Sequence, residues 1–121
     1  MASAAAKSPV RVPYKKIKDE VLGKEYDLSL AFLAAEEMRA VTLRTRKYDK
    51  VSNVLSFPLS KTSGEILICK KAAAPFTVGY LFIHGLFHLK GLKHGATMEK
   101  QERRILKQFG LGYHEQNRNG N

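Results

Sequence analysis

The stretch His84-Gly-Leu-Phe-His88-Leu-Lys-Gly91-Leu-Lys-His94 contains three of the four histidines of the chain. Residues four apart on an α-helix lie one turn above each other on the same face, so His84 and His88 can point at one ion. Gly91 offers a place for the helix to end, because glycine adopts left-handed backbone without steric cost. The chain can then turn and bring His94 back to the same point. The window therefore predicts a helix and a turn that surround a metal ion.

Three neutral imidazoles would leave one position of a tetrahedral zinc ion open for water, as in a catalytic zinc site. Histidines packed in a core are the alternative that the spacing alone leaves open. The pattern H-x-x-x-H-x-x-G-x-x-H is also that of metzincin proteases, but Gly85 stands where those enzymes carry glutamate as general base. A metalloprotease is therefore only a remote alternative.

Length and composition indicate one domain. The chain has 121 residues, 44% of them hydrophobic, which is enough for a core without disulfides. Cys69 is the only cysteine, so an internal disulfide and a cysteine-based zinc site are both excluded, and a core position is its simplest role. The longest apolar stretch, residues 78–87, is too short to span a bilayer. We expect a cytoplasmic protein without membrane association.

The formal net charge of +10 favours a polyanionic partner, because basic side chains neutralise phosphates and release counterions. A merely soluble basic surface is the alternative. Five basic residues on predicted helices are candidates for contact with an RNA backbone, or else are solvated: Lys15, Lys16, Lys18, Arg103 and Arg104.

The periodicity of apolar residues predicts an α/β or α+β fold, with one small mixed β-sheet packed with helices and the histidine helix at its centre. Helices are predicted at 14–22, 35–44, about 76–87 and 98–109, and strands at 26–33, 53–57 and 65–69. Pro75 is expected at the start of the third helix and Thr97 as the cap of the last.

The predicted domain covers residues 14–112. Residues 1–13 are expected to be flexible or to hold a short first strand around residues 10–12, and residues 113–121 to form a frayed polar tail. His114 lies in that tail and is expected to have no role in the site.

Two separated motifs resemble the YbeY-like family of bacterial endoribonucleases, the rRNA maturation factors. One is the histidine window. The other is Arg46-Lys-Tyr-Asp-Lys-Val-Ser-Asn53-Val-Leu-Ser-Phe-Pro58, in which an arginine precedes a strand similar to the family's T-D/N-V-L-S-F-P. Residues 64–69 are similar to the following strand of the family, and residues 99–110 to its C-terminal helix. The resemblance covers about residues 28–112. Lys93 departs from it, since the family usually has aspartate before the third histidine.

The resemblance implies a zinc-dependent, single-strand-specific endoribonuclease that acts in rRNA maturation and ribosome quality control. One Zn²⁺ per chain would be held by the three histidines of the window, His84, His88 and His94. His84 would also be a catalytic residue. Arg46 would be the second catalytic residue, because its planar guanidinium suits phosphate and keeps its charge. Without the resemblance, a surface salt bridge is the simpler role for this arginine.

Asn53 and Ser56 could line the cleft as hydrogen-bond donors to RNA, or could satisfy nearby backbone groups instead. No carboxylate near the histidines stands out as a general base. The expected partners are rRNA, the ribosome or a ribosomal protein, and a GTPase. The alternative function is an RNA- or ribosome-binding module whose zinc site is mainly structural.

Overall fold

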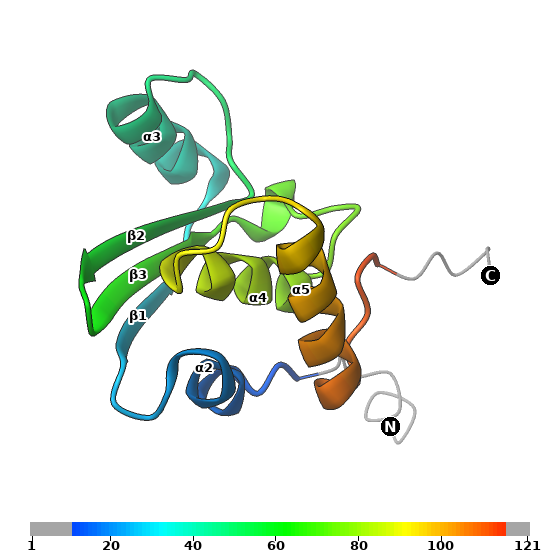
Figure 1. Cartoon of the computed structure of the whole chain (residues 1–121). Coiled ribbons are helices and arrows are strands. Elements are labelled where there is room, and N and C mark those ends of the chain that lie inside the picture. The colour runs from blue at the N-terminus through cyan, green and yellow to red at the C-terminus, as the bar shows by residue number, and fades with distance from the viewer. Residues whose placement is uncertain (1–10, 116–121) are drawn as a thin grey trace, which may run out of the picture.

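The computed structural model describes residues 11–115, and the first strand expected around residues 10–12 lies partly outside this range. Residues 11–13 are not in a strand. The described elements follow one another in the order α2 (Tyr14–Leu22), β1 (Asp27–Phe32), α3 (Ala35–Arg46), β2 (Val54–Ser60), β3 (Ser63–Ile68), the 3-10 helix η1 (Lys70–Ala72), α4 (Val78–Leu89) and α5 (Ala96–Phe109) (Figure 1).

The three strands form one mixed sheet in the order β1-β3-β2. β2 and β3 are joined by a short turn and pair antiparallel, with Leu55 opposite Leu67. β1 pairs parallel to β3, with Leu28 opposite Gly64, and α3 and β2 form the long connection that a parallel pair requires. The α+β fold with a small mixed sheet is thus confirmed.

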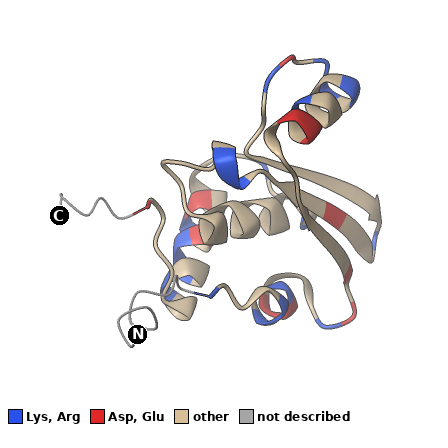
Figure 2. Ribbon diagram, turned by 180° about the vertical axis from the view of Figure 1, so that it is seen from behind, with Lys and Arg blue, Asp and Glu red and all other residues tan. Residues whose placement is uncertain are grey.

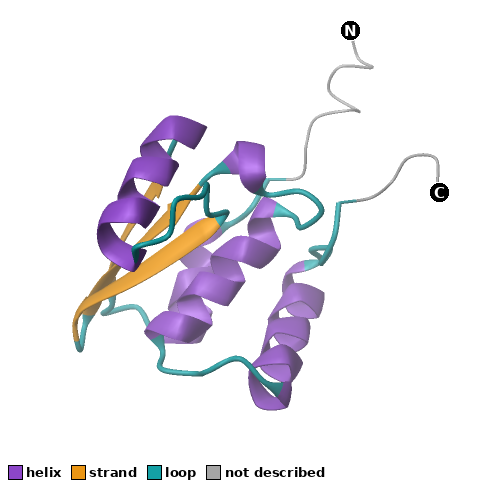
Figure 3. Cartoon of the chain, turned by 90° about the horizontal axis from the view of Figure 1, so that it is seen from above, coloured by secondary structure: helices purple, strands orange, loops and turns teal. Residues whose placement is uncertain are grey.

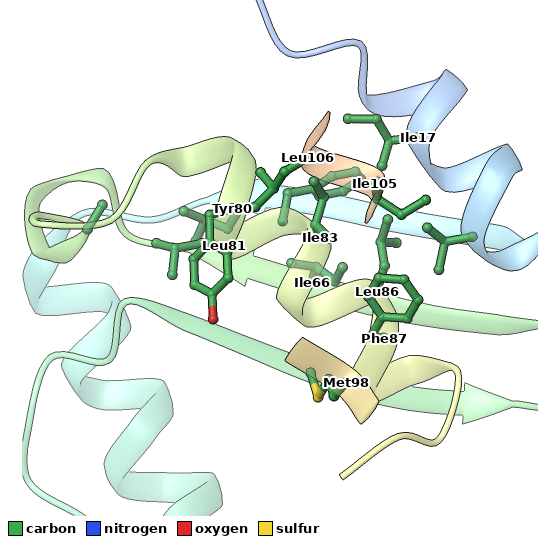
Figure 4. Close-up of a cluster of buried hydrophobic side chains, with 14 residues drawn as sticks. Ile17, Ile66, Tyr80, Leu81, Ile83, Leu86, Phe87, Met98, Ile105 and Leu106 are labelled. Carbon is green, nitrogen blue, oxygen red and sulfur yellow. The ribbon is translucent and has the colours of Figure 1, made fainter. Parts of the chain in front are cut away.

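α4 is the central helix of the domain. It packs against β2 and β3 on one side and against α5 and α2 on others (Figures 1 and 3). Eight of its 12 residues are buried, which explains why its sequence is apolar on nearly all sides. Figure 4 shows Ile83, Leu86 and Phe87 of this helix in one hydrophobic core with Ile66 and Ile105.

Gly85 lets α4 lie close to the sheet. A Cβ atom at this position would lie 3.1 Å from Cδ1 of Ile66, closer than side-chain packing normally allows. The residue that stands where a metzincin has its glutamate therefore faces β3, and its role here is close packing.

The opposite face of the sheet carries α3. Because successive strand residues point to opposite faces, Ile66 and Ile68 join the core around α4, while Leu67 and Cys69 pack with Met38 of α3. Cys69 is fully buried, as its apolar surroundings predicted. The sheet thus separates two cores, and α3 covers the smaller one (Figure 1).

Two helix starts differ from the predictions. α4 begins at Val78 and not at Pro75, because the hydroxyl of Thr77 accepts a hydrogen bond of 2.9 Å from the amide of Tyr80 and so caps the helix. α5 begins at Ala96 after Gly95, so Thr97 lies inside the helix and does not cap it. Both helices begin within a few residues of the predicted position, because apolar periodicity locates a helix better than it locates its first residue.

The segment after α5 is ordered up to residue 115, contrary to the expected fraying from residue 113. The ring of Tyr113 packs on Tyr80 with centroids 4.4 Å apart, and His114 forms an isolated β-bridge with Phe76. Residues 116–121 lie outside the described part. Within residues 11–115, no helix combines the length and the apolar character needed to cross a bilayer.

Candidate metal centre and cleft

α4 and the turn after it bring the three histidines of the window together. His84 and His88 project from the same side of the helix, and their Nε2 atoms lie 3.1 Å apart. Gly91, with a φ of 104°, reverses the chain after α4. His94 thereby returns to the pair, and one nitrogen from each ring lies within 4.8 Å of the others. Two ligands of a tetrahedral zinc ion are separated by about 3.3 Å, close to the spacing of the first pair.

The hydrogen bonds of the far ring nitrogens show how His84 and His88 fit a metal ion. Nδ1 of His84 lies 2.6 Å from the Glu102 carboxylate, and Nδ1 of His88 lies 3.1 Å from the carbonyl oxygen of Leu92. Because carboxylate and carbonyl oxygens accept, we assign the proton to Nδ1 in both rings. The two Nε2 atoms then face each other with lone pairs, an arrangement that a shared cation stabilises.

Glu102 is a site residue that the sequence motifs did not single out, and its carboxylate is engaged with the His84 ring. It comes from α5 and is 3% exposed. Oε1 lies 3.5 Å from the Tyr80 hydroxyl, and burial, followed by the charge of Glu102, raises the pKa of that tyrosine. A sequence signal existed: Glu102 lies between Met98 and Ile105 on the buried face of an amphipathic helix, where carboxylates are rare.

Lys93 stands where the resemblance leads us to expect an aspartate that could accept a hydrogen bond from a histidine ligand. Two of the three histidines have acceptors that do not depend on that position. The acceptor for His84 comes from α5, and the acceptor for His88 is a backbone carbonyl that depends little on sequence. His94 is the exposed member of the three.

Burial lowers the pKa of His88, and the nearby His84 lowers it further. A lowered pKa keeps the ring neutral near pH 7, the form that binds a metal ion.

Arg46 reaches the same cleft from the other motif. α3 extends two residues beyond its predicted end, to Arg46, and Lys47 closes the helix in the left-handed conformation. The guanidinium donates a 3.2 Å hydrogen bond to the carbonyl oxygen of Ser56, and its central carbon lies 5.0 Å from the centroid of the Phe57 ring. Within residues 11–115 no carboxylate pairs with Arg46, so its charge is available to an anion.

One cleft contains both motifs. Arg46, Asn53 and Ser56 line it on the side of α3 and β2, and the three histidines line it on the side of α4. The backbone carbonyls of Asn53 and Ser56 are engaged within the protein, with Cys69 and with Arg46. Among its described lining residues the cleft has two cations, Arg46 and Lys50, and no carboxylate. It therefore suits a polyanion.

The other predicted RNA contacts lie away from this cleft. Lys and Arg gather on α2, α5, η1 and α3 (Figure 2), but Lys15, Lys16, Arg103 and Arg104 do not line the cleft. Lys18 has little surface to offer to RNA: it is 8% exposed, and its ammonium group donates to the carbonyl oxygens of residues 23 and 24 and pairs with Asp19.

Three of the other four predicted RNA contacts have partners within the protein, whereas Lys16 is exposed and pairs with no carboxylate within residues 11–115. Lys15 pairs with Asp19 at 3.1 Å, Arg104 donates to Gln101, and the guanidinium of Arg103 lies over the ring of Tyr113. α2 lies beside β1, whereas the cleft lies at β2, the other edge of the sheet (Figure 1).

Comparison with known proteins agrees with this geometry. The family model described as Endoribonuclease YbeY matches residues 4–110. The chain belongs to the endoribonuclease YbeY family. The resemblance inferred from the two motifs is thus confirmed, and in this member of the YbeY family the two motifs meet in one cleft.

Relatives that bear the name Endoribonuclease YbeY cover most of the chain. The protein from Sulfurimonas denitrificans is 33% identical and matches 80% of this chain and 81% of its own. The protein from Finegoldia magna is 31% identical, over 76% of this chain and 74% of its own. A Thermotoga maritima protein solved in solution has a TM-score of 0.56 at 23% identity, covers 79% of this chain and 78% of its own, and supports the fold.

Proposed function

We propose that this YbeY family member is a zinc-dependent endoribonuclease that cleaves single-stranded RNA and acts in rRNA maturation and ribosome quality control. The observation that carries the proposal is the meeting of Arg46 with three histidines in a cleft whose described lining has no carboxylate. The names of the relatives support RNA as the substrate.

His84, His88 and His94 would hold the zinc ion. When bound, such an ion polarises a phosphoryl oxygen and supplies a water of lowered pKa. Glu102 fixes the orientation of the His84 ring through the 2.6 Å contact to Nδ1. The carbonyl of Leu92 does the same for His88.

Arg46 binds the phosphate and stabilises the negative charge that grows on its oxygens during cleavage. The carbonyl of Ser56 and the ring of Phe57 hold the guanidinium in place before the substrate arrives. A donor that is positioned in advance needs no reorganisation when charge develops, which is the main source of its effect on rate.

A mainly structural zinc site in an RNA- or ribosome-binding module is the competing function. Structural zinc sites use four protein ligands. Among residues 11–115 the candidate set has three histidines, and the nearest carboxylate, Glu102, is engaged with Nδ1 of His84. This donor set favours catalysis over a structural role.

The cellular setting belongs to the same proposal. We expect the protein to act in the cytoplasm on rRNA, in contact with the ribosome or a ribosomal protein and with a GTPase. The Lys and Arg residues that Figure 2 shows on α2 and α5 are candidates for such contacts.

The test is cleavage of a single-stranded RNA by the zinc-loaded protein and by His84→Ala and Arg46→Ala variants. Loss of one positioned donor is expected to lower the rate by roughly 10²–10³-fold in Arg46→Ala. Arg44→Ala is the matched control, because Arg44 is an exposed arginine of α3 that does not line the cleft. Metal analysis should give one zinc per chain in wild type, and none in His88→Ala.

Equal loss of RNA in all variants would identify a contaminating nuclease and contradict the proposal. Retained RNA affinity without cleavage in the zinc-loaded wild type would establish the binding module instead.

A further inference from the structure

A second hollow adjoins the histidine cleft at Arg46. The loop between α3 and β2 forms most of its wall, and Ala72 of η1 closes it. The two hollows share five lining residues, Arg46, Lys50, Asn53, Val54 and Leu55, so they are continuous across the start of β2. We call this second hollow the Tyr48 hollow, because the ring of Tyr48 lines it.

We propose that the Tyr48 hollow binds the unpaired base of the nucleotide next to the phosphate held by Arg46, with Tyr48 stacked on that base. The proposal rests on the proposed ribonuclease function, and it assigns the part of the substrate that reaches beyond the reacting phosphate.

Tyr48 has an aromatic face without a partner. Its side chain is 66% exposed, and within the described part of the chain it stacks on no other ring. Tyr14, Tyr80 and Tyr113 pack on neighbouring rings, and Tyr26 is buried. Because the protein does not cover the face of this ring, the face is free to stack on a ligand. Nucleobases provide the flat surface on which such rings stack.

The surroundings of Tyr48 fit a nucleotide. Val51 and Val54 give the hollow apolar surface for a base, and the side-chain amide of Asn53 forms no hydrogen bond within residues 11–115. Lys50 is exposed and pairs with no carboxylate in that range, so its ammonium can contact a backbone phosphate.

An acidic peptide would match the charges of Arg46 and Lys50 but would leave the ring of Tyr48 unused. The aromatic ring beside two cations therefore favours a single-stranded nucleic acid over a protein partner. A base inside a duplex has both faces covered by its neighbours, so the hollow also provides a reason for selectivity toward single strands.

Tyr48→Trp gives a direct probe, because the chain contains no tryptophan. We expect its fluorescence to be quenched by a short uridylate oligonucleotide with 2′-O-methyl riboses, which resists cleavage. Inorganic polyphosphate, an acidic peptide and an RNA duplex of the same length should leave the fluorescence unchanged. Leu59→Trp is the matched control, since Leu59 is equally exposed at 66% and lines neither hollow. Equal quenching at both positions, or equal quenching by polyphosphate or the peptide, would overturn the proposal.

Binding affinity gives a second readout. Tyr48→Ala should weaken binding of the same oligonucleotide by roughly 5- to 150-fold, the range for loss of one stacked base, while Tyr48→Phe retains the affinity. Wild-type affinity in Tyr48→Ala, or an equal loss in Tyr48→Phe, would contradict stacking. Cleavage of RNA without these effects would contradict base binding in the Tyr48 hollow but not the ribonuclease function. Quenching without cleavage by the zinc-loaded wild type would contradict the ribonuclease function but not base binding.

Discussion

The Nδ1 atom of His84 lies 2.6 Å from Oε2 of Glu102, so a buried carboxylate on α5 orients a metal-ligand candidate on α4. The contact joins two helices that are connected only by a turn, and that turn carries His94. The packing of α5 on α4 therefore determines the metal centre as much as the histidine spacing does.

The first prediction concerns this carboxylate. Glu102→Gln keeps the shape and an acceptor oxygen but removes the charge, so zinc affinity should fall by about 10- to 100-fold, and Glu102→Ala should lose at least as much. Competition against a zinc chelator measures the change. Glu20→Gln, an exposed glutamate of α2 that lines no hollow with the histidines, is the control and should bind zinc as wild type does. Equal affinities of the Glu102→Gln and Glu20→Gln variants would show that the carboxylate does not support the ligand.

The second prediction concerns Tyr26, whose hydroxyl is buried without a hydrogen-bond partner in the described part of the chain. Tyr26→Phe removes this unpaired group and should raise the free energy of unfolding by about 1 kcal/mol. Urea denaturation measures this free energy.

Gly64 lies directly beside the Tyr26 hydroxyl. A Cβ atom at position 64 would overlap the hydroxyl and come within 2.9 Å of Cδ2 of Leu89.

Gly64→Ala alone should therefore destabilise the domain by about 1–3 kcal/mol, and Tyr26→Phe should recover part of that loss in the double variant. Strictly additive effects would show that the hydroxyl and the new methyl group do not meet.

The third prediction concerns pH. Arg39 forms a two-point contact with Asp49, and this hydrogen bonding, followed by the charge of the arginine, lowers the pKa of Asp49. A carboxylate whose folded pKa lies below its unfolded value of about 3.9 stabilises the fold above that pH, and this contribution disappears as the pH falls through the folded pKa.

The melting temperature of wild type should thus exceed that of Asp49→Asn slightly at pH 7, and the two should converge in acid. The difference is small because both side chains are more than half exposed, and added salt should reduce it further. Glu20→Gln, which removes an exposed acid of α2 away from this pair, controls for the change in net charge. A difference that persists below the lowered pKa would contradict the assignment.

The sequence predicts those features of the site that depend on local geometry. The spacing of His84 and His88 with the glycine at position 91 needs only helix periodicity and one turn, and the structure has both. The family resemblance adds Arg46, which is distant in sequence and could not be placed by periodicity. Glu102 falls among the apolar residues of α5, so its burial has a sequence signal, but its contact with His84 depends on which helices pack together. A single sequence does not specify that packing, and the burial of Lys18 was not predicted for the same reason.

The last prediction separates the charge of Arg46 from its shape. Arg46→Lys keeps the positive charge, but an ammonium group has no planar fork with which to contact the carbonyl of Ser56 and a phosphate at the same time. It also loses much of the stacking on Phe57 that holds the guanidinium over β2. We expect kcat/KM for RNA to fall by about tenfold or more, a smaller loss than in Arg46→Ala, with zinc affinity unchanged because Arg46 touches none of the histidines. Steady-state cleavage and chelator competition on the same preparations measure both quantities. Full activity in Arg46→Lys would mean that charge alone suffices, and the contacts with Ser56 and Phe57 would then have no part in catalysis.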